Sequence, residues 1–193
     1  MLGLQLETDP RWVDIASKSI EEILVDHAFC EQKAASTGIS LIIRFSDCQD
    51  LVEEVTEIVA EEWAHFERVL KELKKRGYHL GEPRKDDYVV KLQKIEHKGG
   101  SRETQIMEKL LLSALIEARS CERFKLLHEN LVDPELKKFY YEFMVSEAGH
   151  YITFVNLAKK YNPEEKVKNR LKEMLALEAE IVRNLEWRTD RVH

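Results

Sequence analysis

Apolar residues recur every three or four positions along several long stretches of the chain, which is the spacing that buries one face of an α-helix. This pattern predicts two pairs of long helices and a further helix near the C-terminus. The expected boundaries are about 17–44 and 46–76 for the first pair, 102–130 and 133–160 for the second pair, and 163–187 for the last helix. Each paired helix would be about 40 Å long at 1.5 Å per residue.

Residues that cap helices mark several of these boundaries. Ser46 is followed three residues later by Gln49, which is the spacing of a capping box, and Asp133 precedes a proline that suits the first turn of a helix. Asp9 and Pro10 mark a short helix near the N-terminus in the same way. We therefore expect these helices to begin close to these positions.

The connections between the helices indicate the topology. A tight turn separates the two helices of each pair, so each pair is expected to form an antiparallel hairpin. The hairpins are joined by a long crossover, residues 77–101, which contains glycine and proline and a short expected helix near 87–97. Two hairpins with one long crossover are typical of ferritin-like bundles. The sequence therefore predicts an all-α, ferritin-like four-helix bundle with an additional C-terminal helix, as a single domain of residues 1–193.

The composition excludes several classes of protein. The 193 residues include 7 Gly and 4 Pro, which are too few for the frequent turns of an all-β fold. No apolar stretch approaches the roughly 18 residues that span a bilayer, and the N-terminus lacks the basic and apolar regions of a signal peptide. Three widely spaced cysteines indicate reduced thiols. We therefore expect a cytoplasmic protein with no membrane partner. Its net charge of −6 offers no overall attraction to nucleic acid.

The sequence Glu-x-x-His occurs twice in the predicted helices, at residues 62–65 and 147–150. A spacing of three residues places the carboxylate and the imidazole on one face of a helix. Two such short matches carry little weight alone, so their surroundings matter more. Glu62 and Glu147 both lie on the apolar stripe of their helices, and both are expected to point toward the core.

Two further acids occupy matching positions on the partner helices. Glu31 and Glu62 lie at nearly equal distances from the turn of their hairpin, and the same is true of Glu117 and Glu147. Because the helices of a hairpin are antiparallel and rise equally per residue, each Glu should lie level with the opposing Glu-x-x-His. Four carboxylates and two imidazoles, including those of His65 and His150, are therefore predicted to converge in the bundle.

A buried cluster of this charge indicates metal binding. An unpaired buried carboxylate costs on the order of several kcal/mol, whereas two divalent cations would neutralise four carboxylates. Carboxylate and imidazole ligands without thiolate suit iron or manganese, and Glu together with Glu-x-x-His is the pattern of di-iron carboxylate proteins. The alternative is that the acids are solvated on helix surfaces and the two histidines belong to the core.

The third long helix offers two candidates for the ligand that matches Glu31. The Cys-Glu pair at Glu31 is repeated at Glu122, which would align these two acids. Glu117 and Glu122 lie about 140° apart around a helix, so only one of them can face the metals. Distance from the turn favours Glu117, which leaves Glu122 on another face, paired with Arg119 or Arg123.

Two more residues are candidates for orienting the ligands. His27 precedes Glu31 by one helical turn and shares its face, so it either hydrogen-bonds near the metals or is a buried core histidine. Glu61 is placed to accept the second ring proton of His150, or else lies on the surface as a solvated acid.

Several local strings resemble one known family. Residues 26–36 (DHAFCEQKAAS), 116–124 (IEARSCERF), 77–84 (GYHLGEPR) and 191–193 (RVH), together with both Glu-x-x-His elements, are similar to the MiaE family of tRNA 2-methylthio-isopentenyl-adenosine hydroxylases. The resemblance covers nearly the whole chain. It implies a non-haem di-iron monooxygenase that uses O₂ to hydroxylate the isopentenyl side chain of a modified adenosine beside the tRNA anticodon.

The resemblance also implies the cofactor, the ligands and the partners. Two iron ions would be bound, and the tRNA substrate would be joined by an external electron donor, a reductase or a ferredoxin, because the chain contains no flavin or nucleotide motif. A small homo-oligomer is left open. The implied iron ligands are Glu31, Glu62, His65, Glu117, Glu147 and His150.

Basic residues are concentrated in the segment 71–102. It contains ten Lys and Arg against five Asp and Glu, whereas the rest of the chain has 20 basic and 31 acidic residues. A basic crossover on an acidic chain would orient a polyanion such as tRNA, with Tyr78 and Tyr88 available for stacking. The alternative is a solvated loop. The candidate tRNA contacts are Lys74, Lys75, Arg84 and Lys85.

Other functions compete with this interpretation. Bacterioferritin-like iron storage also uses two Glu-x-x-His motifs, but it requires a cage of many subunits. A di-iron hydroxylase of another substrate, such as a quinone, would need an apolar surface that faces a membrane. A purely structural bundle would bind no iron.

Overall fold

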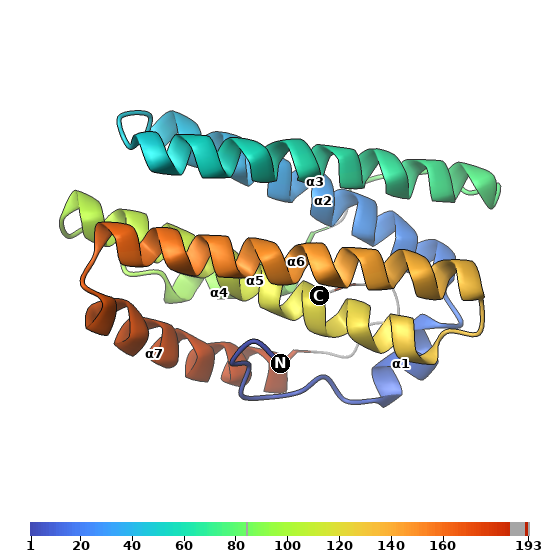
Figure 1. The fold of residues 1–193 in the computed structure, drawn as a ribbon. Helices are drawn as coiled ribbons and strands as arrows, with labels where there is room; N and C mark the ends of the chain where they lie inside the picture. Colours follow the sequence, from blue (N-terminus) through green and yellow to red (C-terminus); the bar gives the residue numbers. More distant parts are fainter. Residues whose placement is uncertain (84, 186–191, 193) are drawn as a thin grey trace. The chain divides into compact units, whose positions relative to one another are not determined.

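The computed structural model describes residues 1–83, 85–185 and 192, without the side chain of Ile15. Over these residues the chain forms helices and no strand (Figure 1), which confirms the all-α prediction. The two expected helix pairs, the short N-terminal helix, the crossover helix and the C-terminal helix are all present. Their bounds are α1 Arg11–Ala16, α2 Ile20–Arg44, α3 Gln49–Lys75, α4 Asp87–Leu92 followed by the 3₁₀ turn η1 Gln93–Ile95, α5 Arg102–Asn130, α6 Pro134–Tyr161 and α7 Glu164–Arg183.

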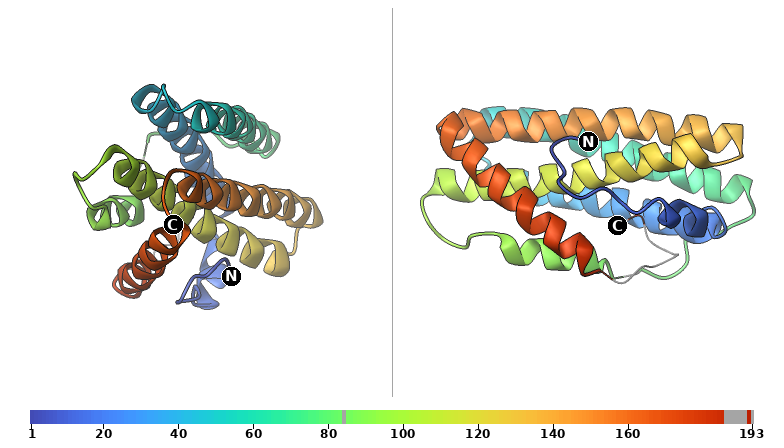
Figure 2. Two further views of the ribbon diagram at one scale, coloured as in Figure 1. Left: turned by 60° about the vertical axis from the view of Figure 1, so that its left-hand side comes forward. Right: turned by 90° about the horizontal axis from the view of Figure 1, so that it is seen from below.

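The described residues divide into two compact units. The hairpin-one unit contains residues 14–85 and Val192, and therefore α2 and α3. The hairpin-two unit contains residues 1–13 and 86–185, and therefore α4 to α7. In each unit the two long helices lie side by side and run in opposite directions (Figures 1 and 2). None of the helices in the described part of the chain is long and apolar enough to cross a membrane.

In the hairpin-one unit, α2 and α3 pack closely because a glycine lies where they meet. A Cβ atom at Gly38 would come within 2.4 Å of Cγ2 of Val59, so only glycine fits at this spacing. Val55 and Leu41 are buried along the same contact. The turn between the helices ends with Cys48, not Ser46, as the N-cap.

The capping box expected at Ser46 is therefore wrong. The backbone N–H of Cys48 donates to the carbonyl of Phe45, which makes a tight turn of residues 45–48 and delays the start of α3 to Gln49. The side chain of Gln49 donates to Glu53 instead of serving the cap. The cap predicted at Asp133 is confirmed, since its carboxylate accepts the first backbone N–H groups of α6.

In the hairpin-two unit, an aromatic cluster fills the space between α5 and α6. Phe124 contacts Tyr140 and Phe143 at ring-centroid distances of 5.5 and 5.9 Å. Helix α7 packs on α4, α5 and α6 and ends at Arg183, earlier than the expected residue 187. The side-chain amide of Asn184 donates to the carbonyl of Glu180 and so competes with continuation of the helix. Residues 186 and 187 lie outside the described residues.

Candidate metal centre

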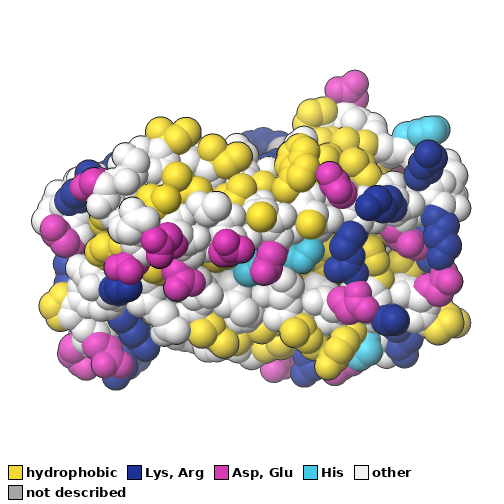
Figure 3. All heavy atoms as spheres, turned by 45° about the horizontal axis from the view of Figure 1, so that its top comes forward, with side chains coloured by type: hydrophobic (Ala, Val, Ile, Leu, Met, Phe, Trp, Pro, Cys, Tyr) yellow, Lys and Arg dark blue, Asp and Glu magenta, His cyan; other side chains and the backbone are white. Residues whose placement is uncertain are grey.

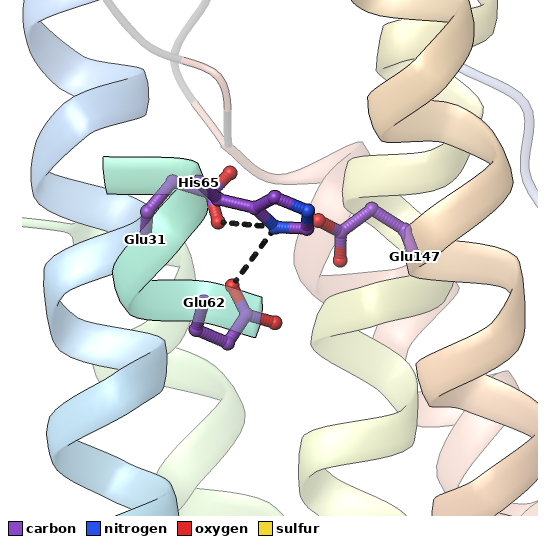
Figure 4. Close-up of side chains that lie close together, drawn as sticks. All are labelled: Glu31, Glu62, His65 and Glu147. Carbon is purple, nitrogen blue, oxygen red and sulfur yellow. Dashed lines mark ion pairs between the residues drawn. The ribbon is translucent and has the colours of Figure 1, made fainter. Parts of the chain in front are cut away.

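The hairpin-one unit brings together three of the predicted ligands. Glu31 on α2 and Glu62 and His65 on α3 are all buried, with Glu62 only 1% exposed. Nδ1 of His65 lies 3.5 Å from Oε2 of Glu31 and 3.6 Å from Oε2 of Glu62 (Figure 4). These three residues each offer a ligand atom within 4.8 Å of the others. They form the half-site of hairpin one.

The spacing of these atoms fits ligands around a metal ion. Direct N–H···O hydrogen bonds measure about 2.7–3.2 Å, so 3.5 and 3.6 Å are longer than that range. Two ligand atoms that are each about 2.1 Å from one ion lie roughly 3.0–3.4 Å apart when the angle between them is that of an octahedron or a tetrahedron. A small adjustment of the side chains would therefore place His65 and both carboxylates around one cation.

The hairpin-two unit contains a second half-site of the same composition. Glu117 on α5 and Glu147 and His150 on α6 are buried. They too each offer a ligand atom within 4.8 Å of the others. Each half-site thus contains one Glu from the first helix of a hairpin and a Glu-x-x-His from the second. These buried clusters of Glu and His can hold metal ions.

The cysteine near the second half-site is a poor metal ligand. Burial, with the charge of Glu117 as a lesser cause, raises the pKa of the Cys121 thiol to about 12. Thiolate is the form that binds metal, and this thiol stays protonated at neutral pH. Its Sγ donates to the carbonyl of Met144 at 3.1 Å. The half-site is therefore one of carboxylate and imidazole.

Glu122 lies in a buried ionic network rather than in the half-site. Its carboxylate accepts hydrogen bonds from the backbone N–H and the hydroxyl of Thr8, at 2.7 and 2.6 Å, and from Arg119 at 2.8 Å. The expected pairing of Glu122 with Arg119 is therefore present. Arg119 also binds Glu178 on α7, and its Nη2 donates to the carbonyl of Leu6. Within the hairpin-two unit, this network connects the N-terminal segment to α5 and α7.

Other buried acids of this unit are compensated by arginine. Glu108 pairs with Arg170 at 2.7 Å and Glu178 pairs with Arg119 at 2.8 Å. Burial opposes the charge of Glu108, yet the hydrogen bonds from Arg170 and from the His97 backbone hold its pKa below the ordinary value. Glu31 and Glu62 lie close to histidine rings, with Nε2 of His27 at 2.6 Å from Glu31 and Nδ1 of His65 at 3.5 and 3.6 Å from the two carboxylates. This mixture of buried carboxylate and imidazole is what makes Glu31 and Glu62 candidate ligands.

The residues expected to orient the ligands have different surroundings. Nε2 of His27 lies 2.6 Å from Oε1 of Glu31, and the His27 ring is completely buried. Glu61 is exposed on α3, and its contact with His150 stays a prediction. Asp26 is not among the predicted site residues, but it is buried beside His27 and accepts the backbone N–H of Val192 at 2.7 Å. An acid next to His27 on an apolar part of the helix indicates a buried polar contact. The sequence could not identify the partner, which is 166 residues away.

Contact of the candidate tRNA-binding residues with tRNA stays a prediction, but most of these residues lie on the surface. Lys74, Lys75 and Lys85 are exposed, whereas Arg84 lies outside the described residues. Figure 3 shows exposed Lys and Arg side chains toward both ends of the face that it draws, with acidic side chains along the middle and among them.

The stacking role expected for Tyr88 is wrong. Its side chain is 1% exposed, and its hydroxyl lies 3.2 Å from Oε1 of Glu178. Burial, and then the charge of Glu178, raises the pKa of this phenol well above its ordinary value. Although its neighbours in sequence are basic, Tyr88 is therefore buried by the packing of α4 within the hairpin-two unit and cannot stack on a base. Tyr78 is half-buried.

The helical fold and the two half-sites together define a ferritin-like protein whose buried Glu and His residues can hold metal. The comparison with known families agrees with this class. The chain belongs to the MiaE family, because the family described as tRNA-(MS2IO6A)-hydroxylase (MiaE) matches residues 2–193. It is an enzyme family, and this finding confirms the resemblance seen in the sequence.

Individual relatives give the same picture. A protein from Pseudomonas putida named tRNA 2-(methylsulfanyl)-N(6)-isopentenyladenosine(37) hydroxylase is 34% identical over 177 residues, which cover 92% of this chain and 85% of that protein. A protein of the same name from Salmonella typhimurium is 28% identical over 134 residues, which cover 69% of this chain and 48% of that protein.

A solved structure confirms the ferritin-like fold. It is titled Protein 43 with aldehyde deformylating oxygenase activity from Synechococcus and has a TM-score of 0.93. Its sequence is 32% identical, and the match covers 98% of this chain and 94% of that chain.

Proposed function

We propose that the chain is a non-haem di-iron monooxygenase that hydroxylates the isopentenyl side chain of 2-methylthio-isopentenyl-adenosine in tRNA. The observation that carries the proposal is the family match over residues 2–193, together with a buried Glu and Glu-x-x-His in each hairpin. The names of the Pseudomonas and Salmonella relatives supply the substrate. They favour this function over iron storage and over a quinone hydroxylase.

The two half-sites are proposed to hold two iron ions in one domain. Glu31, Glu62 and His65 would bind from hairpin one, and the three matching residues of hairpin two would complete the ligand set. Two divalent ions balance the charge of four carboxylates, which is the physical support for this stoichiometry. Bound iron would supply the activation of O₂, so that one oxygen atom enters an allylic C–H bond and the other leaves as water.

The residues of the chain would have three tasks in this reaction. The carboxylates and imidazoles hold the metals, and the buried apolar side chains around them exclude water. The exposed lysines of the segment 71–102 attract the tRNA backbone. The electrons come from an external reductase or ferredoxin, and the reaction takes place in the cytoplasm, where tRNA is modified.

The decisive experiment is nucleoside mass spectrometry of tRNA from cells that make the methylthio-isopentenyl nucleoside. Expression of the chain should convert this nucleoside to its hydroxylated form, and the Glu62→Ala, Glu147→Ala double variant should not. Metal analysis after anaerobic loading with ferrous iron should give about two ions per chain, because four carboxylates need roughly four positive charges. The proposal would be refuted if the nucleoside stayed unhydroxylated in the cells that express the wild-type chain as well as in those that express the double variant.

The solved structure from Synechococcus supports a second candidate, an oxygenase that acts on an aldehyde. The observation that favours it is a TM-score of 0.93 at 32% identity. Incubation of the iron-loaded protein with a long-chain aldehyde, O₂ and a reducing system distinguishes the two functions. Consumption of the aldehyde without hydroxylation of tRNA would favour the second candidate.

A further inference from the structure

The two oxygen atoms of Glu31 have different surroundings. Oε1 lies 2.6 Å from Nε2 of His27, one helical turn earlier on α2. Oε2 lies 3.5 Å from Nδ1 of His65 on the opposite helix. All three side chains are buried. One oxygen therefore faces its own helix, and the other faces the centre of the half-site.

The contact with His27 has the geometry of a strong hydrogen bond. A carboxylate can only accept, so Nε2 of His27 carries the proton in this contact. Hydrogen bonds to an ionised acceptor are shorter and roughly twice as strong as neutral ones, and 2.6 Å is just below the range of about 2.7–2.9 Å typical of such bonds from N–H donors. Because both groups are excluded from water, the bond also restricts rotation of the carboxylate.

We propose that His27 is a positioning residue that makes Glu31 a one-oxygen metal ligand, bound through Oε2. This inference rests on the proposed metal centre and adds how one of its ligands is held. The hydrogen bond from His27 holds Oε1 toward α2 and leaves Oε2 directed at the half-site, so turning both oxygens toward one cation would strain this buried hydrogen bond. The imidazole thus fixes both the direction and the number of oxygens that Glu31 offers.

The hairpin-two half-site has a different residue at the matching position. The residue one turn before Glu117 on α5 is Ser113, which cannot reach as far as an imidazole. The two half-sites share their ligands but differ in the residue behind the first carboxylate. We therefore expect the residue at this position to matter for Glu31, and Ser113 offers a matched position in the other half-site.

A matched pair of amides tests the proposal. The side-chain N–H₂ of glutamine can take the place of Nε2 of histidine, whereas that of asparagine takes the place of Nδ1 and stops short of Oε1. We call the hydrogen bond from His27 to Oε1 of Glu31 the clamp. His27→Gln should therefore keep the clamp and His27→Asn should lose it. Ser113→Ala is the control in the other half-site. Each variant is titrated with Co²⁺ under anaerobic conditions, and binding is followed by its visible absorption.

We expect two cobalt ions to bind to the wild type. His27→Gln and Ser113→Ala should each bind both ions with affinities similar to those of the wild type. In His27→Asn, the affinity of one of the two ions should fall by about 10- to 100-fold, the usual effect of removing a residue that orients a ligand. Circular dichroism of the metal-free proteins checks that each variant is folded.

Three results would overturn the clamp. The first is unchanged cobalt affinity in a folded His27→Asn protein. The second is an equal loss in both amide variants, because the effect would then come from the ring and not from its Nε2 proton. The third, a wild type that binds no cobalt, would overturn the metal centre as well. If cobalt binds normally while tRNA is not hydroxylated, the clamp stands and only the proposed substrate fails.

Discussion

Glu117 and Glu122 lie on one helix, and their surroundings predict opposite consequences of removing each. Glu122 forms part of a buried network with Arg119 and Thr8, so Glu122→Ala should lower the free energy of unfolding by about 3–5 kcal/mol, as expected for breaking a buried ion pair. Glu117 lies close to the carboxylate of Glu147, where its proposed task is to hold metal. Glu117→Ala should therefore change the stability of the metal-free protein much less.

Metal binding should follow the opposite order. The Glu122→Ala protein should still bind two ions, whereas Glu117→Ala should lose one of them, since a ligand reaches only about 2 Å. Urea unfolding and a cobalt titration on the same two preparations make the comparison. Retention of both ions by Glu117→Ala and loss of one by Glu122→Ala would show that the ligand on α5 has been assigned to the wrong acid.

The residue scale also shows where the sequence was informative. The choice of Glu117 over Glu122 followed from distance to the turn, and the surroundings of Glu122 agree with it. The burial of Tyr88 was not predictable, because its neighbours in sequence are basic and its partner, Glu178, is 90 residues away. Local pattern predicts which face of a helix a residue occupies. It does not predict which distant segment covers that face.

At the scale of elements, two glycines within helices predict opposite effects of the same substitution. Gly38→Ala places a Cβ atom where Val59 of α3 already lies, so it should lower stability by about 1–3 kcal/mol through overpacking. Gly149 is exposed on α6, and an added Cβ would meet nothing within 4 Å. Gly149→Ala should therefore raise stability by up to about 1 kcal/mol, because alanine favours helix.

Thermal unfolding of the two glycine variants measures both effects. Each variant is the control for the other, because both carry the same Gly→Ala change within a long helix and differ in the space around the added Cβ atom. Equal shifts in the two melting temperatures would mean that helix propensity alone matters and that α2 and α3 can separate at little cost.

The ion pair between α5 and α7 predicts a dependence of stability on pH. Burial is the largest single influence on Glu108 and raises its pKa, but the hydrogen bonds from Arg170 and the His97 backbone, together with the charge of Arg170, hold the pKa below its ordinary value of 4.5. Its contribution to stability is therefore fully present above pH 4.5 and is lost as the pH falls through the folded pKa. Glu108→Gln should be less stable than the wild type near neutral pH, and this difference should shrink in acid.

Urea unfolding at several pH values below neutrality measures the difference between the two proteins. Glu129→Gln provides the control, because Glu129 is an exposed acid on the same helix at 3.8 Å from Lys125. Exposed pairs contribute little, so this variant should follow the wild type at every pH. A constant difference between Glu108→Gln and the wild type down to strong acid would show that the Glu108 charge is not the source.

The elements themselves were largely predictable, since helical periodicity needs only neighbouring residues. The caps were predictable where side chain and turn agree, as at Asp133, and not where the backbone formed its own turn, as at Ser46. Within each hairpin the ligands could be paired from their distance to the turn, because antiparallel helices have a fixed rise. The hydrogen bond from Val192 to Asp26 could not be predicted, because periodicity carries no information on contacts between distant segments.

At the scale of the whole molecule, both ends of the chain are fixed to a long helix. The N-terminal segment is bound to α5 through Thr8 and Leu6, and Val192 is bound to α2 through Asp26. The first contact belongs to the hairpin-two unit and the second to the hairpin-one unit. One helix of each half-site, α5 in the hairpin-two unit and α2 in the hairpin-one unit, thus makes a hydrogen bond to a residue near the far end of the sequence.

The distribution of charge over the molecule predicts how it binds tRNA. The chain is acidic overall, so attraction of a polyanion depends on local groups of basic residues such as Lys74, Lys75 and Lys85. Reversal of these three residues to Glu should weaken tRNA binding and reduce the dependence of affinity on salt, because fewer counterions are released when fewer phosphates are neutralised. Filter binding over a series of salt concentrations gives both quantities.

A control with the same change in net charge separates local contact from overall repulsion. Lys125, Lys138 and Lys172 are equally exposed but lie on α5, α6 and α7, outside the basic segment. Their reversal to Glu lowers the net charge by the same amount and should leave the salt slope close to that of the wild type. If the two triple variants lose affinity and salt dependence equally, tRNA responds to the total charge of the molecule, and the basic segment is not its contact surface.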